Sequence, residues 1–518
     1  MPDPESSRGS SADPEADPEV DLDAVVIGAG LGGLTAGLML RRAGFTRFRI
    51  IEKNAGVGGT WWENRYPGAE VDVHSHLYSW SFKRFDWSRS HARQPEIQRY
   101  IEEVVDEQGL REHLELGTSV DEAVWEEDRQ RYRVVLSTGA ILHARAVISA
   151  VGLLNTPRYP SWPGFERFTG PKLHTARWED GLDLTGKHVA VVGVGSSATQ
   201  VVAALAPVVG RLTVYQREPG WVLPKGDHDY SDADRARHRS ESELARRRTR
   251  ISYLVQVSRA QFRGRMYKPR TRWSQRSRQL AEGYIAAVFA DRPDLIEAVT
   301  PRYGFAGKRL VLNGDFYPAL LRKNVELVPH AVTALTGTGV VDARGVETAV
   351  DAIVLATGFR TERLLATTKI IGRSGRTLGE TWGDEPRALM GITVPDFPNF
   401  FMLYGPSTHG GEIFLNHRAQ ARWAVRALTR MRRSGVTAVE ARPAALRWYV
   451  RWLERQIRGT AWLETDSYVK NAAGTVITQW PLDALTYAAM ARVLGWIGHR
   501  SSRRLVATPA AQDLERAG

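Results

Sequence analysis

The sequence predicts an α/β protein with two nucleotide-binding units, because one pattern occurs twice. Residues 21–52 begin with a short apolar strand, pass through a glycine-rich turn into a helix, and end with a second apolar strand. The same order starts again at Lys187. A strand, a glycine turn, a helix and a second strand are typical of the Rossmann-like dinucleotide-binding fold. Two copies therefore predict two such domains in one chain.

The first glycine turn is followed by an acidic residue at the position that binds the ribose hydroxyls of a dinucleotide. Gly28, Gly30 and Gly33 fit the pattern G-x-G-x-x-G between a strand and a helix. These glycines let the backbone approach a pyrophosphate, which then lies at the positive end of the helix. Glu52 ends the next strand, 19 residues after Gly33. Its carboxylate is placed to accept the hydroxyl groups of an adenosine ribose, so we expect a dinucleotide site here.

The second glycine turn differs at the ribose position. Gly193 and Gly195 form the turn, and Ser196 and Ser197 within it are expected to donate to phosphate rather than to act as nucleophiles. The strand that follows ends at Arg217, with no acidic residue at the ribose position. A carboxylate there would repel a 2'-phosphate, whereas Arg217 can pair with one. The second site is therefore expected to prefer NADPH to NADH.

The absence of cysteine limits the chemistry of the chain. Without cysteine there is no disulfide, no thiolate metal site and no dithiol redox pair. Redox chemistry then requires bound cofactors, and NADPH in the second unit would pass its hydride to FAD in the first. No thiol can accept that hydride afterwards, which excludes a disulfide reductase. A monooxygenase, an oxidase or a reductase that serves a separate protein is left.

The net charge of +12 comes mostly from one segment. From Ser231 to Leu280 there are 15 Arg and Lys residues against 4 Asp and Glu residues. A local surplus of this kind is typical of a solvated helical face, and no nucleic-acid partner is expected. Steering of anionic NADPH, or contact with an acidic partner, is the alternative.

The order of the strands suggests that the second domain is inserted into the first. The opening residues are rich in Pro, Asp, Glu and Ser and predict a disordered tail rather than a signal peptide. No stretch reaches the roughly 18–20 apolar residues of a membrane span, so we expect a soluble, cytoplasmic protein. The expected parts are a tail at 1–20, a discontinuous FAD-binding domain at 21–155 and 325–430, an NADPH-binding domain at 156–324 with a helical insert at about 230–300, and a C-terminal helical region at 431–518.

The end of the chain is apolar and then basic. Residues 485–500 read LTYAAMARVLGWIGHR. We expect a helix packed on its own protein, with a peripheral membrane contact as the alternative.

The motif Phe168, Gly170, His174 and Trp178 lies between the two glycine turns. It resembles the fingerprint of the Baeyer-Villiger monooxygenases, which belong to the class B flavoprotein monooxygenases and are related to the flavin-containing monooxygenases. One position departs from that family, because Glu179 follows Trp178 where Pro or Asp is usual. Further motifs similar to this family, spread over most of the chain, are Gly58–Asp72, Gln216-Arg217, Gly307-Lys308-Arg309 and Ala356-Thr357-Gly358-Phe359.

The resemblance implies that a ketone is oxidised to an ester or lactone with NADPH and O2, through a flavin C4a-peroxide. A cation beside the peroxide would keep it deprotonated and would stabilise the oxyanion that develops. Arg309 matches the family's residue in that role, and Asp72 matches the carboxylate that holds it. The fingerprint residues, including His174, are expected to gate the movement of the domains rather than to transfer protons.

The resemblance also implies which residues contact the cofactors. The expected FAD contacts are Gly28, Gly30, Gly33, Glu52, Gly59, Thr60, Trp61, Asp72, Tyr78 and Val120. The expected NADPH contacts are Gly193, Gly195, Ser196, Ser197, Arg217, Lys308, Ala356, Thr357 and Gly358. We expect the substrate to meet the loop after Gly358 and residues 404–415 and 467–480, with 468–480 as a mobile cover.

Two alternatives stay open for the function. A protonated flavin hydroperoxide would oxygenate amine nitrogen or thioether sulfur, and an NADPH-flavin reductase or oxidase would serve a partner protein. His74 and His76 are spaced for one face of a strand, as a metal pair would be, but they lack a third ligand at a familiar spacing. No metal is expected.

Overall fold

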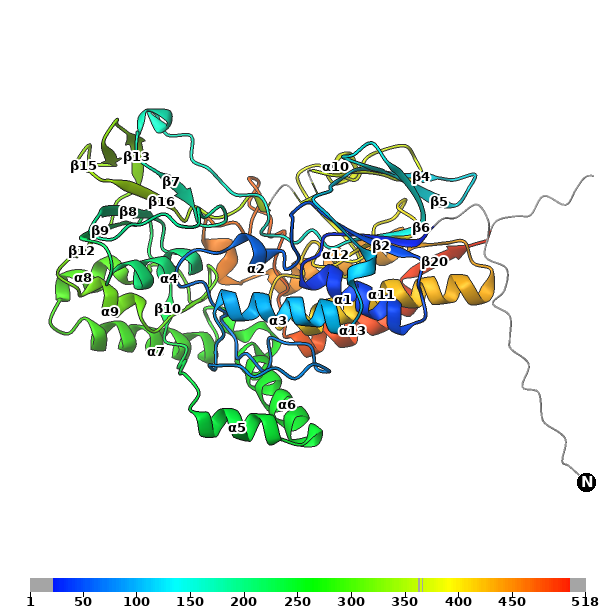
Figure 1. Cartoon of the computed structure of the whole chain (residues 1–518), viewed down its shortest axis with the longest axis horizontal. Coiled ribbons are helices and arrows are strands. Elements are labelled where there is room, and N and C mark those ends of the chain that lie inside the picture. The colour runs from blue at the N-terminus through cyan, green and yellow to red at the C-terminus, as the bar shows by residue number, and fades with distance from the viewer. Residues whose placement is uncertain (1–21, 362–363, 366, 504–518) are drawn as a thin grey trace, which may run out of the picture.

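A computed structural model describes residues 22–361, 364–365 and 367–503. The tail expected at 1–20 lies outside these residues. Two α/β units lie side by side, and a group of helices projects below them (Figure 1). The prediction of two Rossmann-like units in one α/β chain is confirmed. None of the described helices is long and apolar enough to cross a membrane.

The first unit is built on a mixed sheet in the order β17-β4-β5-β6-β1-β2-β3, with β18 paired to β6. Strand β1 is apolar and its last four residues are buried, as expected of a strand covered on both faces. Strands β1, β2, β3, β6 and β18 run parallel, and β4 and β5 form an antiparallel extension. The strands are β1 (Leu22–Ile27), β2 (Phe48–Glu52), β3 (Leu114–Leu116), β4 (Val120–Glu126), β5 (Arg131–Leu136), β6 (Ile141–Ser149), β17 (Lys369–Ile371) and β18 (Phe400–Met402).

Helices cover the lower face of this sheet in Figure 1, with α1 between the sheet and α11. Nine of the residues of α1 are buried, because the helix is enclosed from both sides. The helices of the unit are α1 (Leu31–Arg42), α2 (Thr60–Glu63), α3 (Gln94–Glu107), α10 (Leu378–Trp382) and α11 (Ile413–Ser434), with a short 3-10 turn at Arg111–His113.

The second unit is a parallel sheet in the order β12-β9-β8-β16-β7. Helix α4 follows β8 through the second glycine turn, and an antiparallel group, β13 to β15, lies beside the sheet (Figure 1). The elements are β7 (Lys172–His174), β8 (His188–Val192), α4 (Ser196–Leu205), β9 (Arg211–Tyr215), β10 (Val222–Leu223), β11 (Val311–Leu312), α9 (Phe316–Leu320), β12 (Val325–Val328), β13 (Val332–Leu335), β14 (Gly339–Asp342), β15 (Glu347–Ala349) and β16 (Ala352–Leu355), with a 3-10 turn at Phe165–Arg167.

The expected boundary at residues 324 and 325 is wrong. Val325 of β12 pairs with Leu212 of β9, and β16 lies between β8 and β7 in the second sheet. The chain enters the first sheet again only at β17, which pairs with β4. A short, fully buried apolar strand such as β16 fits the interior of either sheet, so its sequence does not indicate which of the two it joins.

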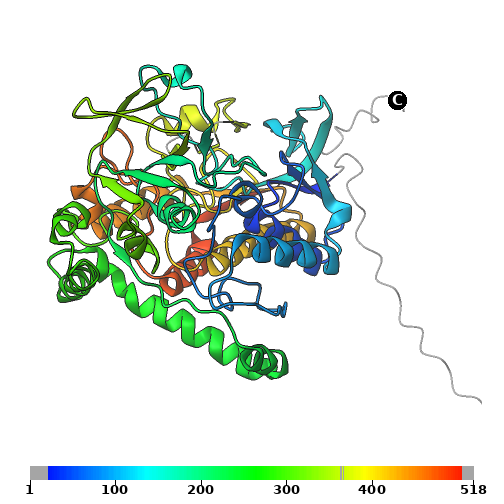
Figure 2. The same cartoon turned by 60° about the vertical axis from the view of Figure 1, so that its left-hand side comes forward.

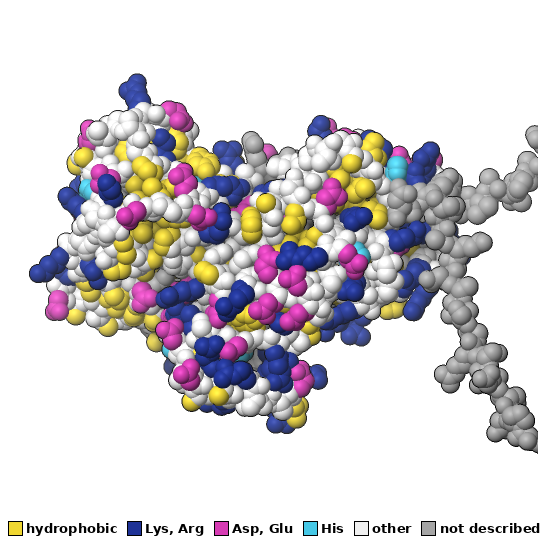
Figure 3. Space-filling model, viewed as in Figure 1, with side chains coloured by type: hydrophobic (Ala, Val, Ile, Leu, Met, Phe, Trp, Pro, Cys, Tyr) yellow, Lys and Arg dark blue, Asp and Glu magenta, His cyan; other side chains and the backbone are white. Residues whose placement is uncertain are grey.

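The helical excursion from the second unit docks on a loop of the first. It contains α5 (Asp232–Ser240), α6 (Glu243–Ala260), a 3-10 helix (Phe262–Tyr267), α7 (Arg272–Val288) and α8 (Pro293–Val299), which run along one side of the molecule in Figure 2. Lys and Arg side chains gather over α5 and α6 (Figure 3). Arg235 and Arg239 both pair with Asp86, at 2.7 and 2.9 Å, so part of this charge attaches the excursion to the first unit.

The C-terminal region combines helices with a small sheet. Helix α11 crosses the expected start at residue 431, and the strands β19 and β20 pair antiparallel after it. The elements are β19 (Ala438–Ala441), α12 (Pro443–Ile457), a 3-10 turn (Ala461–Glu464), α13 (Ala484–Ile497) and β20 (His499–Ser502). Helix α13 packs on α11, where Gln420 donates 2.6 Å to the hydroxyl of Tyr487 and Trp423 donates 3.0 Å to the carbonyl of Ala491.

Gly33 allows the first turn of α1 to close against the end of β1. A Cβ at this position would lie 1.8 Å from the carbonyl oxygen of Gly28. That oxygen belongs to the backbone, so it cannot move aside as a flexible side chain could. The third glycine of the first motif is thus required by packing beneath the turn.

We predict that Gly33→Ala lowers the free energy of unfolding by about 1–3 kcal/mol or more, as overpacking typically does. Thermal unfolding of the purified protein measures the change. Gly283→Ala in α7 is the matched control, because its Cβ would meet nothing within 4 Å. There the same substitution should stabilise the protein by about 0.5–1 kcal/mol through helix propensity. Equal effects of the two substitutions would contradict the prediction.

Candidate active site

The two glycine turns border one cavity of about 530 Å³. The first unit contributes its glycine turn and the loop that follows α2, and the second contributes the start of α4 and the segment before β11. The expected site residues that line this cavity are Gly28, Gly30, Glu52, Gly59, Thr60, Trp61, Asp72, Tyr78, Val120, Ser196, Ser197, Lys308 and Arg309.

Glu52 is buried beneath the first turn and orders it. Its Oε2 accepts 2.7 Å from the backbone N–H of Ala29, and its Oε1 accepts from the backbone and side-chain amides of Asn54, at 2.9 and 2.7 Å. A carboxylate offers about four acceptor positions, so these bonds leave room for a ribose hydroxyl. Glu52 also lines the cavity. The first turn therefore fits the adenosine end of a dinucleotide.

The second turn presents an open helix start. Gly195 caps α4, and a Cβ built there would meet nothing within 4 Å. The space around Gly195 can hold a phosphate group beside the first backbone N–H groups of this ten-residue helix. Ser196 and Ser197 face the same cavity. This turn fits a pyrophosphate, as its sequence predicts.

Lys308 lies beside the second site but is ion-paired to Glu218. Arg217, the residue before Glu218, is exposed and has no hydrogen bond or ion pair within the described part of the chain. Sequence reasoning expected both cations to be available to a 2'-phosphate and did not consider Glu218. Glu218 therefore competes with a phosphate for the charge of Lys308.

Arg309 and Asp72 form an ion pair that spans the two units. Nη2 of Arg309 lies 2.6 Å from Oδ2 of Asp72, and both residues line the cavity. Desolvation lowers the pKa of Arg309, but attraction to Asp72 outweighs it and holds the pKa above its usual value. Arg309 is therefore a permanent cation. The structure brings together the two residues that were expected to form the active centre.

Three polar residues near Arg309 lie in the segments that were expected to meet or cover the substrate, although His409 itself was not named from the sequence. His409 lies between two tyrosines, with its Nδ1 2.6 Å from the hydroxyl of Tyr404 and its Nε2 3.4 Å from that of Tyr468. Burial and the charge of Arg309 lower the pKa of His409 to about 3, so the ring is neutral. A neutral imidazole has one donor and one acceptor, so one tyrosine donates to it and the other accepts.

Glu412 caps α11 at the edge of the same cavity. It accepts from the backbone N–H groups of Phe414 and Leu415, at 2.9 and 2.6 Å. Burial raises its pKa to about 7, although these two hydrogen bonds oppose the shift. The segment 404–415 was expected to meet the substrate, but the roles of His409 and Glu412 in it depend on tertiary burial that spacing does not show.

The fingerprint residues lie outside the cavity wall formed by the described residues. His174 is buried on β7, where its Nδ1 accepts 3.1 Å from the N–H of Ala176 and its Nε2 lies 3.2 Å from the carbonyl of Gly358. Burial lowers its pKa to about 4. Both ring nitrogens are used by the backbone, which supports a structural role. Gly170 is required by packing, since a Cβ would lie 2.4 Å from the carbonyl oxygen of Asp351.

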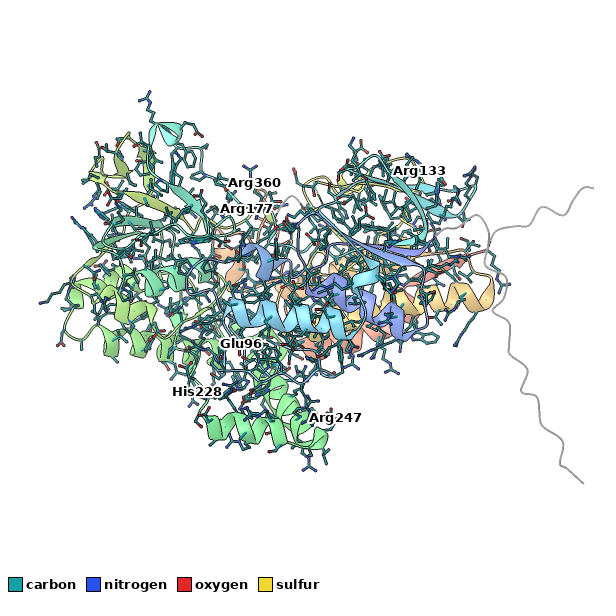
Figure 4. The ribbon with its side chains drawn as sticks, viewed as in Figure 1. Glu96, Arg133, Arg177, His228, Arg247 and Arg360 are labelled. Atoms are coloured by element: carbon teal, nitrogen blue, oxygen red, sulfur yellow. The ribbon has the colours of Figure 1, made fainter. Side chains whose placement is uncertain are left out.

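The segment after His174 ties the second unit to the first. Arg177 lies 3.5 Å from Glu63, and Asp180 lies 2.8 Å from Arg65. Figure 4 shows Arg177 and Arg360 at the junction of the two units. Glu179, which departs from the family fingerprint, is exposed and has no hydrogen bond or ion pair among the described residues. Glu179 therefore takes no part in the ion pairs of this junction.

A second contact joins the units at the cavity itself. The hydroxyl of Tyr66, in the first unit, bonds to Gln200 and Ser197 of α4 at 2.8 and 3.2 Å. Gln200 donates 3.1 Å back to the carbonyl of Glu70. Residues 66–72, which end at Asp72, thus rest on the helix that starts at the second glycine turn.

The other residues expected to contact NADPH pack against the second turn and do not line the cavity. Ala356 packs closely against Gly193. A Cβ on Gly193 would lie 2.6 Å from the carbonyl oxygen of Ala356. Thr357 donates 2.5 Å to the carbonyl of Arg158, and the carbonyl of Gly358 contacts His174. These residues shape the junction between the units rather than the cavity wall.

His74 and His76 belong to an aromatic cluster. Their rings lie 5.3 Å apart, and Nε2 of His74 lies 3.1 and 2.9 Å from the hydroxyls of Tyr230 and Tyr253. Burial lowers the pKa of His74 to about 3. In the described part of the chain no group of three or more His, Cys, Asp or Glu side chains is arranged to hold a metal ion.

Comparison with known proteins agrees with this arrangement. Residues 25–284 match the family model described as pyridine nucleotide-disulphide oxidoreductase. A Baeyer-Villiger monooxygenase of Streptomyces coelicolor is 36% identical over 462 residues, which cover 88% of each chain. A solved structure of an oxidised steroid monooxygenase bound to NADP aligns with a TM-score of 0.83 and 31% identity, over 92% of this chain and 99% of that one.

A complex of OTEMO with FAD and NADP aligns equally well, with a TM-score of 0.83, 26% identity, and coverage of 93% of this chain and 100% of that one. The family model's name includes disulphide chemistry, which a chain without cysteine cannot perform. The family model covers residues 25–284, whereas the match to the Streptomyces monooxygenase covers 462 residues. By identity, coverage and fold, this chain belongs to the Baeyer-Villiger monooxygenase family.

Proposed function

We propose that this chain oxidises a ketone to an ester or lactone, with FAD in the first unit, NADPH in the second and O2 as the oxidant. The Arg309–Asp72 pair carries the proposal, because it places a permanent cation in the cavity that both nucleotide turns border. The enzyme is proposed to act in the cytoplasm, where NADPH is regenerated. The identity of the ketone is set by the loop 404–415 and the segment 467–480.

FAD bound at the first turn supplies hydride acceptance from NADPH and activation of O2. Arg309 then stabilises the negative charge that develops on the carbonyl oxygen of the ketone as it is attacked. Asp72 holds the guanidinium in place through the ion pair. Because the pKa of Arg309 is raised, its charge does not depend on pH in the working range.

The polar network beside Arg309 orients the substrate. Tyr404, His409 and Tyr468 form a chain of hydrogen bonds around a neutral ring. The segment that carries Tyr468 is bonded to the loop that carries His409, since the N–H of Trp480 donates 2.9 Å to the carbonyl of His409. This segment excludes water from the cavity, and we propose that it opens to admit substrate.

Arg309→Ala is predicted to lower the rate of ester formation by about 100-fold or more, as the loss of an oxyanion-stabilising donor does. Reduction of the flavin by NADPH, followed by absorbance, should change only slightly, and H2O2 should replace the missing ester. Arg302→Ala is the control, because Arg302 is exposed and pairs only with the exposed Glu297 among the described residues. Normal ester production by Arg309→Ala would exclude the proposed role.

Glu218→Gln is predicted to lower the KM for NADPH by about two- to fivefold. The substitution releases Lys308 for the 2'-phosphate, and separating an exposed ion pair costs about 0.2–1 kcal/mol. The KM for NADH should not change, since NADH has no 2'-phosphate. Glu297→Gln, at an exposed acid paired with Arg302, is the matched control. Equal changes in the KM for NADPH and for NADH would contradict a role of Glu218 in the binding of the 2'-phosphate.

A panel of ketones, thioethers and amines tests the reaction class. We expect ketones to gain 16 mass units as esters or lactones, with NADPH consumption coupled to product. Products only from thioethers or amines would assign heteroatom oxygenation instead. Stoichiometric H2O2 with every compound would indicate an NADPH oxidase or a reductase that needs a partner protein.

A further inference from the structure

Helix α13 exposes a continuous apolar face. Its exposed large apolar residues are spaced by one or two helical turns, so they lie on one side of the helix. They are Leu485, Val493, Trp496 and Ile497, which are 44, 58, 77 and 64% exposed. Large indole and aliphatic side chains exposed together on one face usually mark an interaction surface.

The opposite side of α13 already completes the protein's own packing. Tyr487, Ala491 and Leu494 are buried against α11. Gly495 fits closely against Trp423, where a Cβ would lie 2.0 Å from Nε1. In Figure 1, α13 lies below α11, on the side away from the first sheet. The exposed face is therefore not needed to hold the helix in place.

Unpaired arginines border the apolar face. Arg418, Arg422 and Arg426 recur every fourth residue on α11, and Arg492 joins them from α13. None of the four has a hydrogen bond or ion pair within residues 22–503 as far as these are described. Burial and the neighbouring Arg418 and Arg492 lower the pKa of Arg422, which shows that these charges repel one another. An anionic partner would relieve that repulsion.

We propose that the apolar face of α13 and its border of arginines bind an anionic membrane surface. An interfacial helix places Trp and aliphatic residues among the acyl chains and basic residues at the headgroups, which is the arrangement found here. At 14 residues α13 is about 21 Å long, enough to lie along the surface but not to span the bilayer. A second copy of the chain is disfavoured, because packing α13 on α13 would bring two groups of arginines together.

The absence of cysteine allows a label to be placed on this face alone. Ile497→Cys carries a polarity-sensitive dye, and Leu280→Cys on the arginine-rich helix α7 is the matched control, since these residues are 64 and 65% exposed. With vesicles of phosphatidylglycerol and phosphatidylcholine, the dye at 497 should shift to the blue and the dye at 280 should not. The shift should be absent with phosphatidylcholine alone and should decrease in 0.5 M salt.

Cosedimentation with the same vesicles tests which side chains contribute. Two double variants should each weaken binding roughly tenfold. One combines Val493→Ser with Trp496→Ser, and the other combines Arg422→Gln with Arg426→Gln. The flavin spectrum and activity on a soluble ketone should stay unchanged, which shows that each variant is folded.

Three outcomes would overturn the proposal. One is a dye shift at 497 that grows with protein concentration without vesicles, which would assign the face to a second copy. Another is that the full chain does not bind anionic vesicles. This outcome counts against the proposal even if a variant that lacks the acidic residues 1–20 does bind. The third is an equal response at 497 and 280, which would show non-specific attraction of a basic protein.

Discussion

The ion pair between Arg309 and Asp72 connects the two halves of this protein at the cavity that both glycine turns border. Asp72 belongs to the first unit and Arg309 to the second, so the cation is correctly placed only while the units are held together. Tyr66 and Gln200 fix the loop that ends at Asp72 on the helix that starts at the second glycine turn. The partner of the cation is thus tied by hydrogen bonds to that helix.

The fingerprint residues of this chain contribute to the junction of the units and do not line the cavity. His174 is held by two backbone groups, and Arg177 and Asp180 bind the first unit. Because His174 does not line the cavity, its ring is not placed to exchange protons with a molecule bound there. Its ring instead joins β7 to the backbone of Gly358, next to the segment that contacts the first unit.

Local sequence was sufficient where a function depends on the backbone of one turn. The two glycine motifs, Glu52 and Arg217 each follow directly from a strand, a turn and a helix in series. The resemblance to a family added Asp72 and Arg309, which lie far apart in the chain and meet only in the fold. Strand β16 was assigned to the wrong sheet, because a sequence of four buried apolar residues does not indicate which strands it pairs with. His409, Glu412 and Glu218 were missed because burial and ion pairing decide their properties.

Glu218 illustrates how a local pattern can be correct and still incomplete. Arg217 indicates a 2'-phosphate site, and the structure leaves its guanidinium exposed. The next residue along the chain is an acid that pairs with the second cation of that site. In the proposed site, a carboxylate so close to Arg217 and Lys308 would reduce their attraction for a 2'-phosphate. In the proposed function NADPH reaches and leaves the second unit, so a site of reduced affinity would suit exchange, whereas the buried carboxylate of Glu52 would suit retention of FAD.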